Sequence, residues 1–450
     1  MSLQQAIDVY HSLLTPELAE DSGAQLVDQL ARRGLFFGSR PLSSVLRPRF
    51  LTPEQYALLR KRTAVLLSAF DKLYRAAMAE PAVRAQFRLS DWEEELIRAD
   101  PGFAEPSPVS RLDAFFVHER GGLKFTEYNA ETPAAASYND VLAAVFLGLP
   151  AMREFLRTHE VTAPLSRHNV LHALVAAYRE WSGRREKPRI AIIDWKDVPT
   201  YSEFVITQEY FREQGYECTI ADPQSCEYRG GRLYADGFET DLVYKRVLIN
   251  ELIEGGGLDQ PLVRAVRDGA VCMVNPFRCK LLHKKASLAA LSDEANAGLL
   301  TTGERDAVAA HIPWTRVVEE RRTTAEGGDV ELVPYIVANQ ARLVLKPNDE
   351  YGGKGIVLGW EVSPAEWEEA VRAALAEPYV VQERVELPRE PFPSLVDGRL
   401  EMIDRIVDTA PFCFHGSYMD GCLSRLSTAS LVNVTAGSGS SVATFIVQRR

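Results

Sequence analysis

Polar side chains follow a two-residue spacing in two neighbouring segments, and together they could bind a metal ion and phosphate. Arg111 and Asp113 alternate in the first segment, and Glu127 and Asn129 alternate in the second. Side chains two residues apart share one face of a strand, so a hairpin with a turn of three or five residues would place Asp113 opposite Glu127. Arg111 then lies opposite Asn129. Carboxylate and amide oxygens suit Mg²⁺, and a guanidinium can bind phosphate through paired hydrogen bonds.

This hairpin has a second interpretation. A surface hairpin held together by salt bridges would use the same polar residues equally well. Beyond the polar patch, we expect an apolar wall to continue along the same face of the two strands. These wall residues are Phe115, Val117, Leu123 and Phe125.

A second segment places lysines beside a run of glycines. Lys346 ends a predicted strand, and a loop rich in glycine leads to the next strand. Adjacent glycines let backbone amides approach anionic oxygens, and a lysine adds positive charge, so the segment predicts a lid over phosphates. The loop lacks the GxxxxGK[ST] pattern and leads into a strand, so it is not a P-loop. A plain hairpin turn with solvent-exposed lysines is the alternative. The loop residues concerned are Gly352, Gly353, Lys354 and Gly355.

Two further segments could complete a nucleotide site. After the glycine loop, Ser363 and Glu366 form a capping-box start to a helix, and a strand follows that contains Gln382 and Glu383. An edge-lying peptide there could offer backbone groups to adenine, and Glu383 could accept a hydrogen bond from the exocyclic amine; an ordinary exposed glutamate is the alternative. Near the end of the chain, Arg425 precedes Asn433 and the glycine-serine loop 437–441, a combination that binds anions or simply turns.

The elements that must position these residues change along the chain. Residues 1–105 are mostly helical, and one helix is expected to start at Thr52. Residues 106–185 carry the hairpin, and residues 186–275 alternate strands and helices as in a Rossmann-like layer. Residues 276–450 begin with a helix over 281–293 and continue as a β-rich region with the glycine loop. No GxGxxG follows the first strand of the Rossmann-like layer, so dinucleotide binding lacks its main support.

Composition excludes several classes of function. The 450 residues are 46% hydrophobic and 25% charged, with a net charge of -11 and no long basic stretch, so nucleic acid is not an expected partner. The longest apolar run is too short to cross a bilayer, and the N-terminal segment is amphipathic and has no signal-peptide pattern. The six cysteines form neither a CxxC pair nor a Cys–His metal motif. We therefore expect a cytoplasmic protein with reduced thiols.

Considered together, these motifs resemble the nucleotide site of the circularly permuted ATP-grasp family, and in particular the synthetase domain of glutathionylspermidine synthetase. EYNAETP, with RLD upstream, resembles the metal-binding hairpin; NPFRCKLLHKKASLAAL resembles the segment with the nucleotide lysine; KPNDEYGGKG and VVQERV resemble the lid and the adenine hinge. The resemblance covers about Arg111 to Val447. In this chain the acidic hairpin precedes the lysine and lid segments, which is the permuted order. The cysteine amidase half is absent, so the substrate of the named enzyme does not transfer.

The resemblance implies a fold and a set of roles. The implied fold is an α/β (α+β) ATP-grasp fold in permuted order, with a Rossmann-like pre-ATP-grasp domain and a helical N-terminal region. Mg²⁺ ligands are implied at Asp113, Glu127 and Asn129, and a phosphate or acyl-phosphate contact at Arg111. A nucleotide contact is implied at Lys285, with Lys284 as the alternative. The further implied ATP contacts are Lys346, Gly352, Gly353, Lys354, Gly355, Gln382 and Glu383.

The implied function is an ADP-forming ligase that uses ATP and Mg²⁺ to join a small-molecule or peptide carboxylate to an amine through an acyl phosphate. Arg111, Lys346 and Arg425 are the catalytic candidates. The loop after the first Rossmann-like strand offers Tyr201 and Ser202 as substrate contacts, although Ser202 could instead cap a helix. Two other functions remain open: an ATP-binding protein of this fold without ligase activity, and an ATP-dependent small-molecule kinase.

Overall fold

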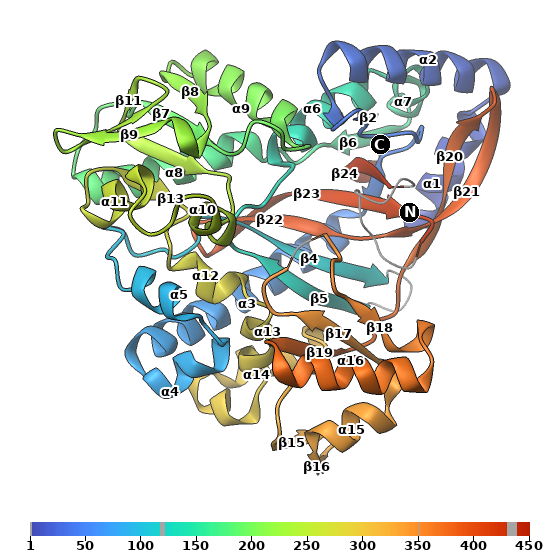
Figure 1. Cartoon of the computed structure of the whole chain (residues 1–450). Coiled ribbons are helices and arrows are strands. Elements are labelled where there is room, and N and C mark those ends of the chain that lie inside the picture. Colours follow the sequence, from blue (N-terminus) through green and yellow to red (C-terminus); the bar gives the residue numbers. More distant parts are fainter. Residues whose placement is uncertain (1, 118–121, 351, 430–438) are drawn as a thin grey trace.

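A computed structural model describes residues 2–117, 122–350, 352–429 and 439–450 of the chain. It is a mixed α/β structure with a large sheet through its centre, a parallel sheet at one end and a smaller antiparallel lobe at another (Figure 1). Within these residues, no helix combines the length and the apolar character needed to cross a membrane.

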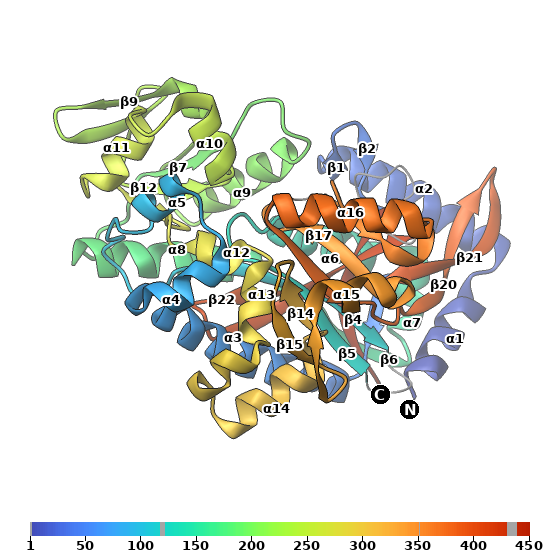
Figure 2. The ribbon, with the colours of Figure 1, turned by 60° about the horizontal axis from the view of Figure 1, so that its bottom comes forward.

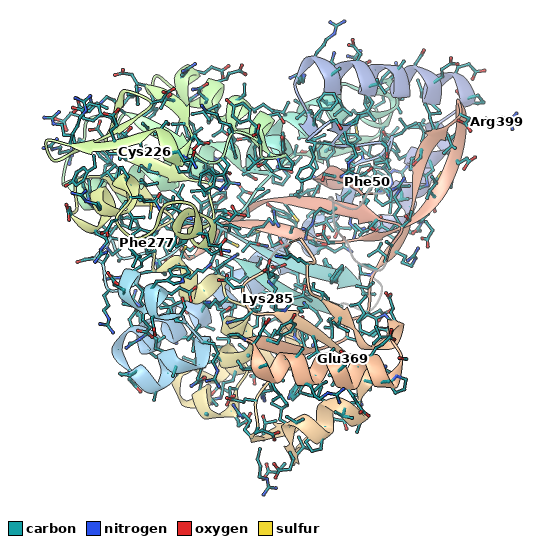
Figure 3. All side chains as sticks on the ribbon, viewed as in Figure 1. Phe50, Cys226, Phe277, Lys285, Glu369 and Arg399 are labelled. Atoms are coloured by element: carbon teal, nitrogen blue, oxygen red, sulfur yellow. The ribbon has the colours of Figure 1, made fainter. Side chains whose placement is uncertain are left out.

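The large sheet joins nine described strands from distant parts of the chain. Six of them follow the order β20-β21-β23-β22-β4-β5, and β24 pairs with β23, β3 and β6. The β20–β21 hairpin projects from the sheet, and Arg399 lies near its outer end (Figure 3). The strands are β3 (Arg49–Leu51), β4 (Val109–Val117), β5 (Gly122–Asn129), β6 (His159–Thr162), β20 (Arg389–Val396), β21 (Arg399–Val407), β22 (Ala410–Phe414), β23 (Tyr418–Ser427) and β24 (Ser440–Arg449).

The N-terminal helices pack on this sheet. The helix expected at Thr52 is confirmed as α3 (Pro53–Ala79), and Thr52 and Gln55 form its capping box. Phe70 of α3 packs with Leu112 and Phe125 in one core beneath the β4–β5 hairpin. A second core packs four helices against β24: α1 (Leu3–Leu13), α2 (Pro16–Arg32), α6 (Ala136–Gly148) and α7 (Pro150–Phe155).

The expected Rossmann-like layer is present as a parallel sheet of four described strands in the order β13-β12-β7-β8. Helices cover both faces, with α8 and α9 in one core and α10 and α11 in another (Figure 1). The elements are β7 (Ile190–Ile193), β8 (Cys218–Ala221), β12 (Leu242–Lys245), β13 (Cys272–Val274), α8 (Arg167–Ser182), α9 (Tyr201–Glu213), α10 (Ile249–Gly256) and α11 (Pro261–Arg267).

The antiparallel lobe faces the β4–β5 hairpin of the large sheet. Its strands follow the order β14-β19-β17-β18, and α15 and α16 cover its outer face (Figure 2). Ser363 and Glu366 form the expected capping box of α16. The elements are β14 (Thr315–Val317), α15 (Leu332–Ala338), β17 (Leu343–Pro347), β18 (Val357–Leu358), α16 (Pro364–Ala376) and β19 (Tyr379–Glu383).

The single helix expected over 281–293 is wrong. The chain forms two short helices, α12 (Cys279–His283) and α13 (Ala286–Leu291), and it breaks at Lys284 and Lys285. Tertiary contacts explain the break, because Asn348 binds the chain there: its Oδ1 accepts a hydrogen bond from Ala286 N at 2.8 Å, and its carbonyl oxygen accepts one from Lys285 N at 2.9 Å. An N-terminus capped from a distant segment is not visible in local helix propensity.

All six cysteines are buried and unpaired by disulfides. They lie in pairs in three of the cores: Cys413 and Cys422 beneath the hairpin, and the others on the two faces of the parallel sheet, with Cys218 and Cys272 on one face and Cys226 and Cys279 on the other. The thiols therefore serve as core side chains.

Candidate functional site

A pocket with about 970 Å³ of empty space, partly open to solvent, lies between the β4–β5 hairpin and the antiparallel lobe. The wall combines acids, cations, glycines and apolar side chains. Its residues are Asp113, Ala114, Phe115, Thr126, Glu127, Val344, Lys346, Gly352, Gly353, Ile356, Leu358, Trp360, Gln382, Glu383, Arg384, Val385, Leu387, Asp408 and Arg425.

The predicted register of the acidic hairpin is confirmed. Asp113 pairs with Glu127, and Arg111 pairs with Asn129. The hairpin tip, including His118, lies outside the described residues. Both carboxylates line the pocket, so the two-residue spacing correctly identified a shared face.

The apolar wall expected beyond the carboxylates is partly wrong. A bulge adds Thr126 to β5, so that Ala114 pairs with Phe125 instead of with Thr126. Phe115 lines the pocket as expected, but Leu123 and Phe125 point to the opposite face and are buried in the core with α3. The extra residue reverses the alternation of β5, and the sequence pattern alone does not reveal it.

Asp113 accepts four hydrogen bonds from three residues. Arg111 Nε and Nη2 bind its two oxygens at 2.7 and 3.0 Å, Arg425 Nη2 binds it at 2.7 Å, and Asn129 Nδ2 binds it at 3.0 Å. Burial opposes ionisation, but the two guanidinium groups lower the pKa of Asp113 to about 2. Asp113 is therefore a carboxylate at neutral pH.

The two arginines of this group differ in what they can offer a ligand. Arg111 uses Nη1 on the Ala134 carbonyl at 2.9 Å and its other two nitrogens on Asp113, and it does not line the pocket. Arg425 does line the pocket, between Asp113 and Asp408. The geometry places Arg111 behind Asp113 and Arg425 beside it.

Asp408 is a site residue that the sequence analysis missed. Its carboxylate accepts hydrogen bonds from the Nε and backbone N of Arg425. Burial raises the pKa of Asp408, although the charge of Arg425 opposes this shift. No local spacing marks Asp408, because its partner Arg425 lies 17 residues further along the chain, in β23.

The two candidate lysines of the α12–α13 segment point to different partners. Lys285 Nζ lies 3.3 Å from Glu127, in the interior between the large sheet and the lobe (Figure 3). Lys284 Nζ lies 2.9 Å from Glu93 instead. Removal from water opposes ionisation of Glu127, but Lys285 and other nearby cations keep its pKa below the ordinary value. Of the two lysines, Lys285 is the one beside the acidic hairpin.

Lys346 spans the pocket from the lobe toward the hairpin. Its Nζ donates to Gln382 Oε1 at 2.6 Å and to the Thr126 carbonyl at 3.4 Å. Removal from water lowers its pKa to about 8, although Glu127 acts in the opposite direction. This lysine is a cation at neutral pH and is close to losing its proton.

Two of the predicted loop glycines line the pocket, Gly352 and Gly353, and both have positive φ, 66° and 82°. Such backbone angles favour glycine because a Cβ is strained there. Lys354 is exposed and pairs with Glu350 at 3.1 Å, and neither it nor Gly355 lines the pocket. The loop therefore presents backbone, and not the Lys354 ammonium, to the pocket.

Gln382 and Glu383 line the pocket, but the edge position expected for them is wrong. Their strand, β19, lies between β14 and β17, and Glu383 N already donates to the Trp314 carbonyl at 2.8 Å. The pocket continues past the end of β19 along Arg384 and Val385. Arg384 N is also bonded, to the Arg342 carbonyl at 2.8 Å, so the backbone amides of Glu383 and Arg384 both have partners within the protein.

The structure does not bring Tyr201 and Ser202 to this pocket. They form the first turn of α9, whose cap position is Thr200, so the suggested cap at Ser202 is wrong. Ser202 Oγ donates to the Phe36 carbonyl at 2.9 Å and lies 2.5 Å from the Tyr138 hydroxyl. Tyr201 is 41% exposed.

A second group missed by the sequence analysis lies at the carboxyl end of the parallel sheet. Arg246, just after β12, donates to the Pro133 carbonyl at 2.6 Å, next to the Ala134 carbonyl that Arg111 binds. Glu203 of α9 accepts from Ala135 N at 2.9 Å. The loop after the acidic hairpin thus connects the pocket to the sheet edge where open α/β sheets commonly bind ligands.

Among the described residues, no three His, Cys, Asp or Glu side chains are arranged to hold a metal by themselves. The donor set at the hairpin is two ionised carboxylates and one amide, which fits Mg²⁺ when phosphate oxygens complete the shell.

Comparison with known proteins gives a sequence relative and similar solved structures. No protein-family profile matches the chain. The chain is 28% identical over 465 residues to a Frankia alni (strain DSM 45986 / CECT 9034 / ACN14a) protein with the provisional name glutamate–cysteine ligase 2-3. The match covers 94% of this chain and 50% of that protein, so the chain spans about half the length of this curated relative.

The solved apo structure of a glutathione synthetase-like effector, GSS30, from Globodera pallida aligns with a TM-score of 0.60 at 13% identity, over 97% of this chain and 95% of that one. The two proteins share an overall fold. A D-alanyl-alanine synthetase A from Vibrio cholerae O1 biovar eltor str. N16961 gives a TM-score of 0.28 at 10% identity, over 59% of this chain and 89% of that one, which is too low to indicate a shared fold. The expected α/β class of fold is therefore confirmed.

Proposed function

We propose that the chain is an ATP- and Mg²⁺-dependent ligase that joins a carboxylate to an amine through an acyl phosphate and releases ADP and phosphate. The observation that carries the proposal is the pocket itself. One wall holds two ionised carboxylates and Arg425, and the facing wall holds Lys346 and two glycines with positive φ. Charges of both signs around one pocket suit a nucleotide triphosphate with its metal.

The nucleotide base occupies the apolar end of the pocket in this proposal. Val344, Ile356, Leu358 and Trp360 line that part of the wall, and Gln382 and Glu383 provide polar groups beside it. The phosphates then extend toward Lys346, Gly352 and Gly353, where backbone amides and an ammonium can neutralise them.

Asp113, Glu127 and Asn129 would hold Mg²⁺, which neutralises charge on the phosphate oxygens when it is bound. In this proposal Lys285, which lies beside Glu127, and Arg425, which lies beside Asp113, neutralise charge on the transferring phosphate. Arg111 orients Asp113 through two hydrogen bonds and acts on the reaction through it.

The chemistry requires no nucleophile from the protein. A substrate carboxylate oxygen attacks the γ-phosphorus of ATP and ADP leaves; the amine then attacks the acyl carbon, loses a proton, and phosphate leaves. The cysteines fit this mechanism, because all six are buried and burial raises the pKa of each thiol, including Cys422 to about 12. Catalysis then consists of positioning and charge neutralisation.

We place the acid and the amine between the pocket and the carboxyl end of the parallel sheet. Arg246 is a buried cation there. It binds the Pro133 carbonyl, and Arg111 binds the adjacent Ala134 carbonyl. Tyr201, exposed at the start of α9, remains a substrate candidate, and Ser202 is a weaker one because its hydroxyl is already bonded. The name of the Frankia alni relative supports an amino acid or peptide as the carboxylate, and the permuted ATP-grasp order is part of this proposal.

Thermal unfolding with and without MgATP tests the proposal. A ligand that binds only the folded state stabilises it by about 2.7 kcal/mol at a concentration of 100 Kd. We expect MgATP to raise the Tm of the native chain, and Glu127→Ala and Lys346→Ala to reduce that shift.

One matched control is Glu369→Ala, on the exposed face of α16 (Figure 3). The other is Lys187→Ala, whose side chain donates to the Gln214 carbonyl and does not line the pocket. Both should keep the full shift. Absence of a shift in the native chain at saturating MgATP would overturn the proposal. A shift would justify a screen of acid and amine pairs for ADP release, in which product mass separates a ligase from a kinase.

A further inference from the structure

A buried ionic cluster lies next to the pocket but does not line it. Lys280 Nζ of α12 lies 3.2 Å from Glu131 and 2.8 Å from Asp349. Lys245 of β12 lies 3.4 Å from Glu131 on its other side, and Lys284 joins Asp349 to Glu93 at 3.4 and 2.9 Å. Three lysines thus face three carboxylates.

The burial of this cluster is nearly complete. Glu131 and Lys245 are 0% exposed and Lys280 is 1% exposed, whereas the Asp349 side chain is 23% exposed. Replacing a buried ion pair with apolar side chains is often neutral or stabilising, so stability alone does not account for such a cluster. Its value lies in the geometry that it fixes.

The cluster connects segments that the proposed reaction must keep in register. Glu131 follows the acidic hairpin two residues after Asn129, and Asp349 begins the glycine loop three residues before Gly352. Lys280 lies between them and binds both. A single ammonium therefore links the end of the metal-binding hairpin to the root of the phosphate-binding loop.

The root of the loop also determines the position of Lys285. Asn348, next to Asp349, accepts hydrogen bonds from Lys285 N and Ala286 N. Lys285 Nζ in turn donates to the Glu350 carbonyl. Movement of the loop root would therefore displace Lys285 from Glu127.

We propose that Lys280 is a positioning residue: by holding Asp349 and Glu131 at once, it keeps the glycine loop and Lys285 aligned with the carboxylates of the acidic hairpin. This inference rests on the proposed function of the pocket. Lys280 itself touches no ligand in this scheme and acts through Asp349.

Lys245 provides a matched control because it is also a fully buried lysine on Glu131 but has no contact with Asp349. Lys280→Met and Lys245→Met each leave Glu131 with one lysine. A purely structural cluster predicts similar effects from the two variants. A positioning role predicts that only the loss of Lys280 changes the loop and nucleotide binding.

The experiment measures MgATP affinity by titration in the folded native chain and in Lys280→Met, Lys245→Met and Asp349→Asn. We expect Lys280→Met and Asp349→Asn each to weaken MgATP binding about tenfold, with no further loss in the double variant, because both remove the same contact. Lys245→Met should lower the Tm but keep MgATP affinity within about twofold.

Trypsin cleavage after the exposed Lys354 provides a readout that does not depend on nucleotide. Cleavage there should be faster in Lys280→Met and Asp349→Asn than in Lys245→Met. Equal affinity and equal cleavage in folded Lys280→Met and the native chain would overturn the inference, as would equal losses in Lys245→Met.

A variant that fails to fold and a native chain that fails to bind MgATP have different consequences. If Lys280→Met does not fold, Asp349→Asn decides, because Lys280 and Lys284 each keep another carboxylate there. If the native chain does not bind MgATP, the proposed function fails, while the cleavage comparison at Lys354 still supports or overturns the link through Lys280.

Discussion

The surroundings of Lys346 shift the pKa of its side chain. It reaches Gln382 and the Thr126 carbonyl across the pocket, and removal from water brings its pKa from 10.5 to about 8. Below pH 8 the folded protein holds a poorly hydrated ammonium. Between pH 8 and 10.5 the unfolded chain binds more protons at this residue, so this lysine alone makes stability rise with pH across that window.

The affinity for MgATP should depend on the same proton. Phosphates favour the ammonium, so above pH 8 binding requires proton uptake and should weaken by up to about tenfold per pH unit. Lys346→Arg keeps its charge and should show a flat profile. Titrations of MgATP from pH 7 to 10 measure both; a flat profile in the native chain would contradict a phosphate contact at Lys346.

Asp113 gives a second pH prediction, of the same sign as that for Lys346, because the pKa of each group is lower in the folded protein. Its pKa in the folded state is about 2, below the ordinary 3.8, so its contribution to stability is present above about pH 4 and is lost as the pH falls toward 2. Asp113→Asn should abolish this part of the acid sensitivity and lower stability at neutral pH by roughly 3 kcal/mol or more, since it leaves buried Arg111 unpaired. Urea unfolding from pH 2 to 7 measures the difference. Identical pH profiles for the variant and the native chain would show that Asp113 is not paired as described.

Residue types and local spacing identified part of the site. Arg111, Asp113, Glu127 and Asn129 alternate in two strands, and a period of two is a local property that a sequence displays. Asp408 and Lys280 could not be found in this way, because their roles depend on partners that only the tertiary structure brings near.

At the scale of elements, the β4–β5 hairpin shows how one residue changes a face. Thr126 is the extra residue of the bulge, and its insertion sends Leu123 and Phe125 into the core while Phe115 stays in the pocket. Strand alternation predicts a face correctly only up to the first bulge. The break between α12 and α13 is a similar case, since its cap comes from Asn348.

The two phenylalanines give a matched test of the bulge. Phe125→Ala should cost about 3–5 kcal/mol of unfolding free energy, because it empties a fully buried position, and should leave the pocket wall in place. Phe115→Ala should cost about 1–2 kcal/mol and weaken MgATP binding. Urea unfolding and MgATP titration of both variants make the comparison. A larger loss of stability in Phe115→Ala than in Phe125→Ala would contradict the observed register.

At the scale of the whole molecule, the first and last segments belong to one structure. β3 pairs with β24 in parallel, and α1 and α2 pack in the same core as β24. The division at residue 105 suggested by composition therefore crosses a continuous sheet and core. Composition describes a segment but not the segments that pack against it, so the strand order of the large sheet could not be predicted from the sequence. The strands of the Rossmann-like layer are close together in sequence, so that layer could be predicted.

A fragment of residues 106–450 tests this continuity. It lacks β3, α1, α2 and α3, so β24 loses a neighbour and two cores are exposed. We expect the fragment to show no cooperative thermal transition, and co-expression with residues 1–105 to restore one. Circular dichroism melting measures both. A cooperative transition in the fragment alone would show that residues 106–450 fold independently.

The arrangement of the cysteines allows local unfolding to be measured separately in three cores. Two thiols lie in each of three separate cores, none is bonded to another, and burial holds the pKa of every one above its ordinary value. An alkylating reagent can therefore label a pair only when its core admits solvent. Mass spectrometry of peptides labelled for increasing times would then give three separate labelling rates from the unmodified chain. One rate reports on the core beneath the acidic hairpin, and the other two report on the two faces of the parallel sheet.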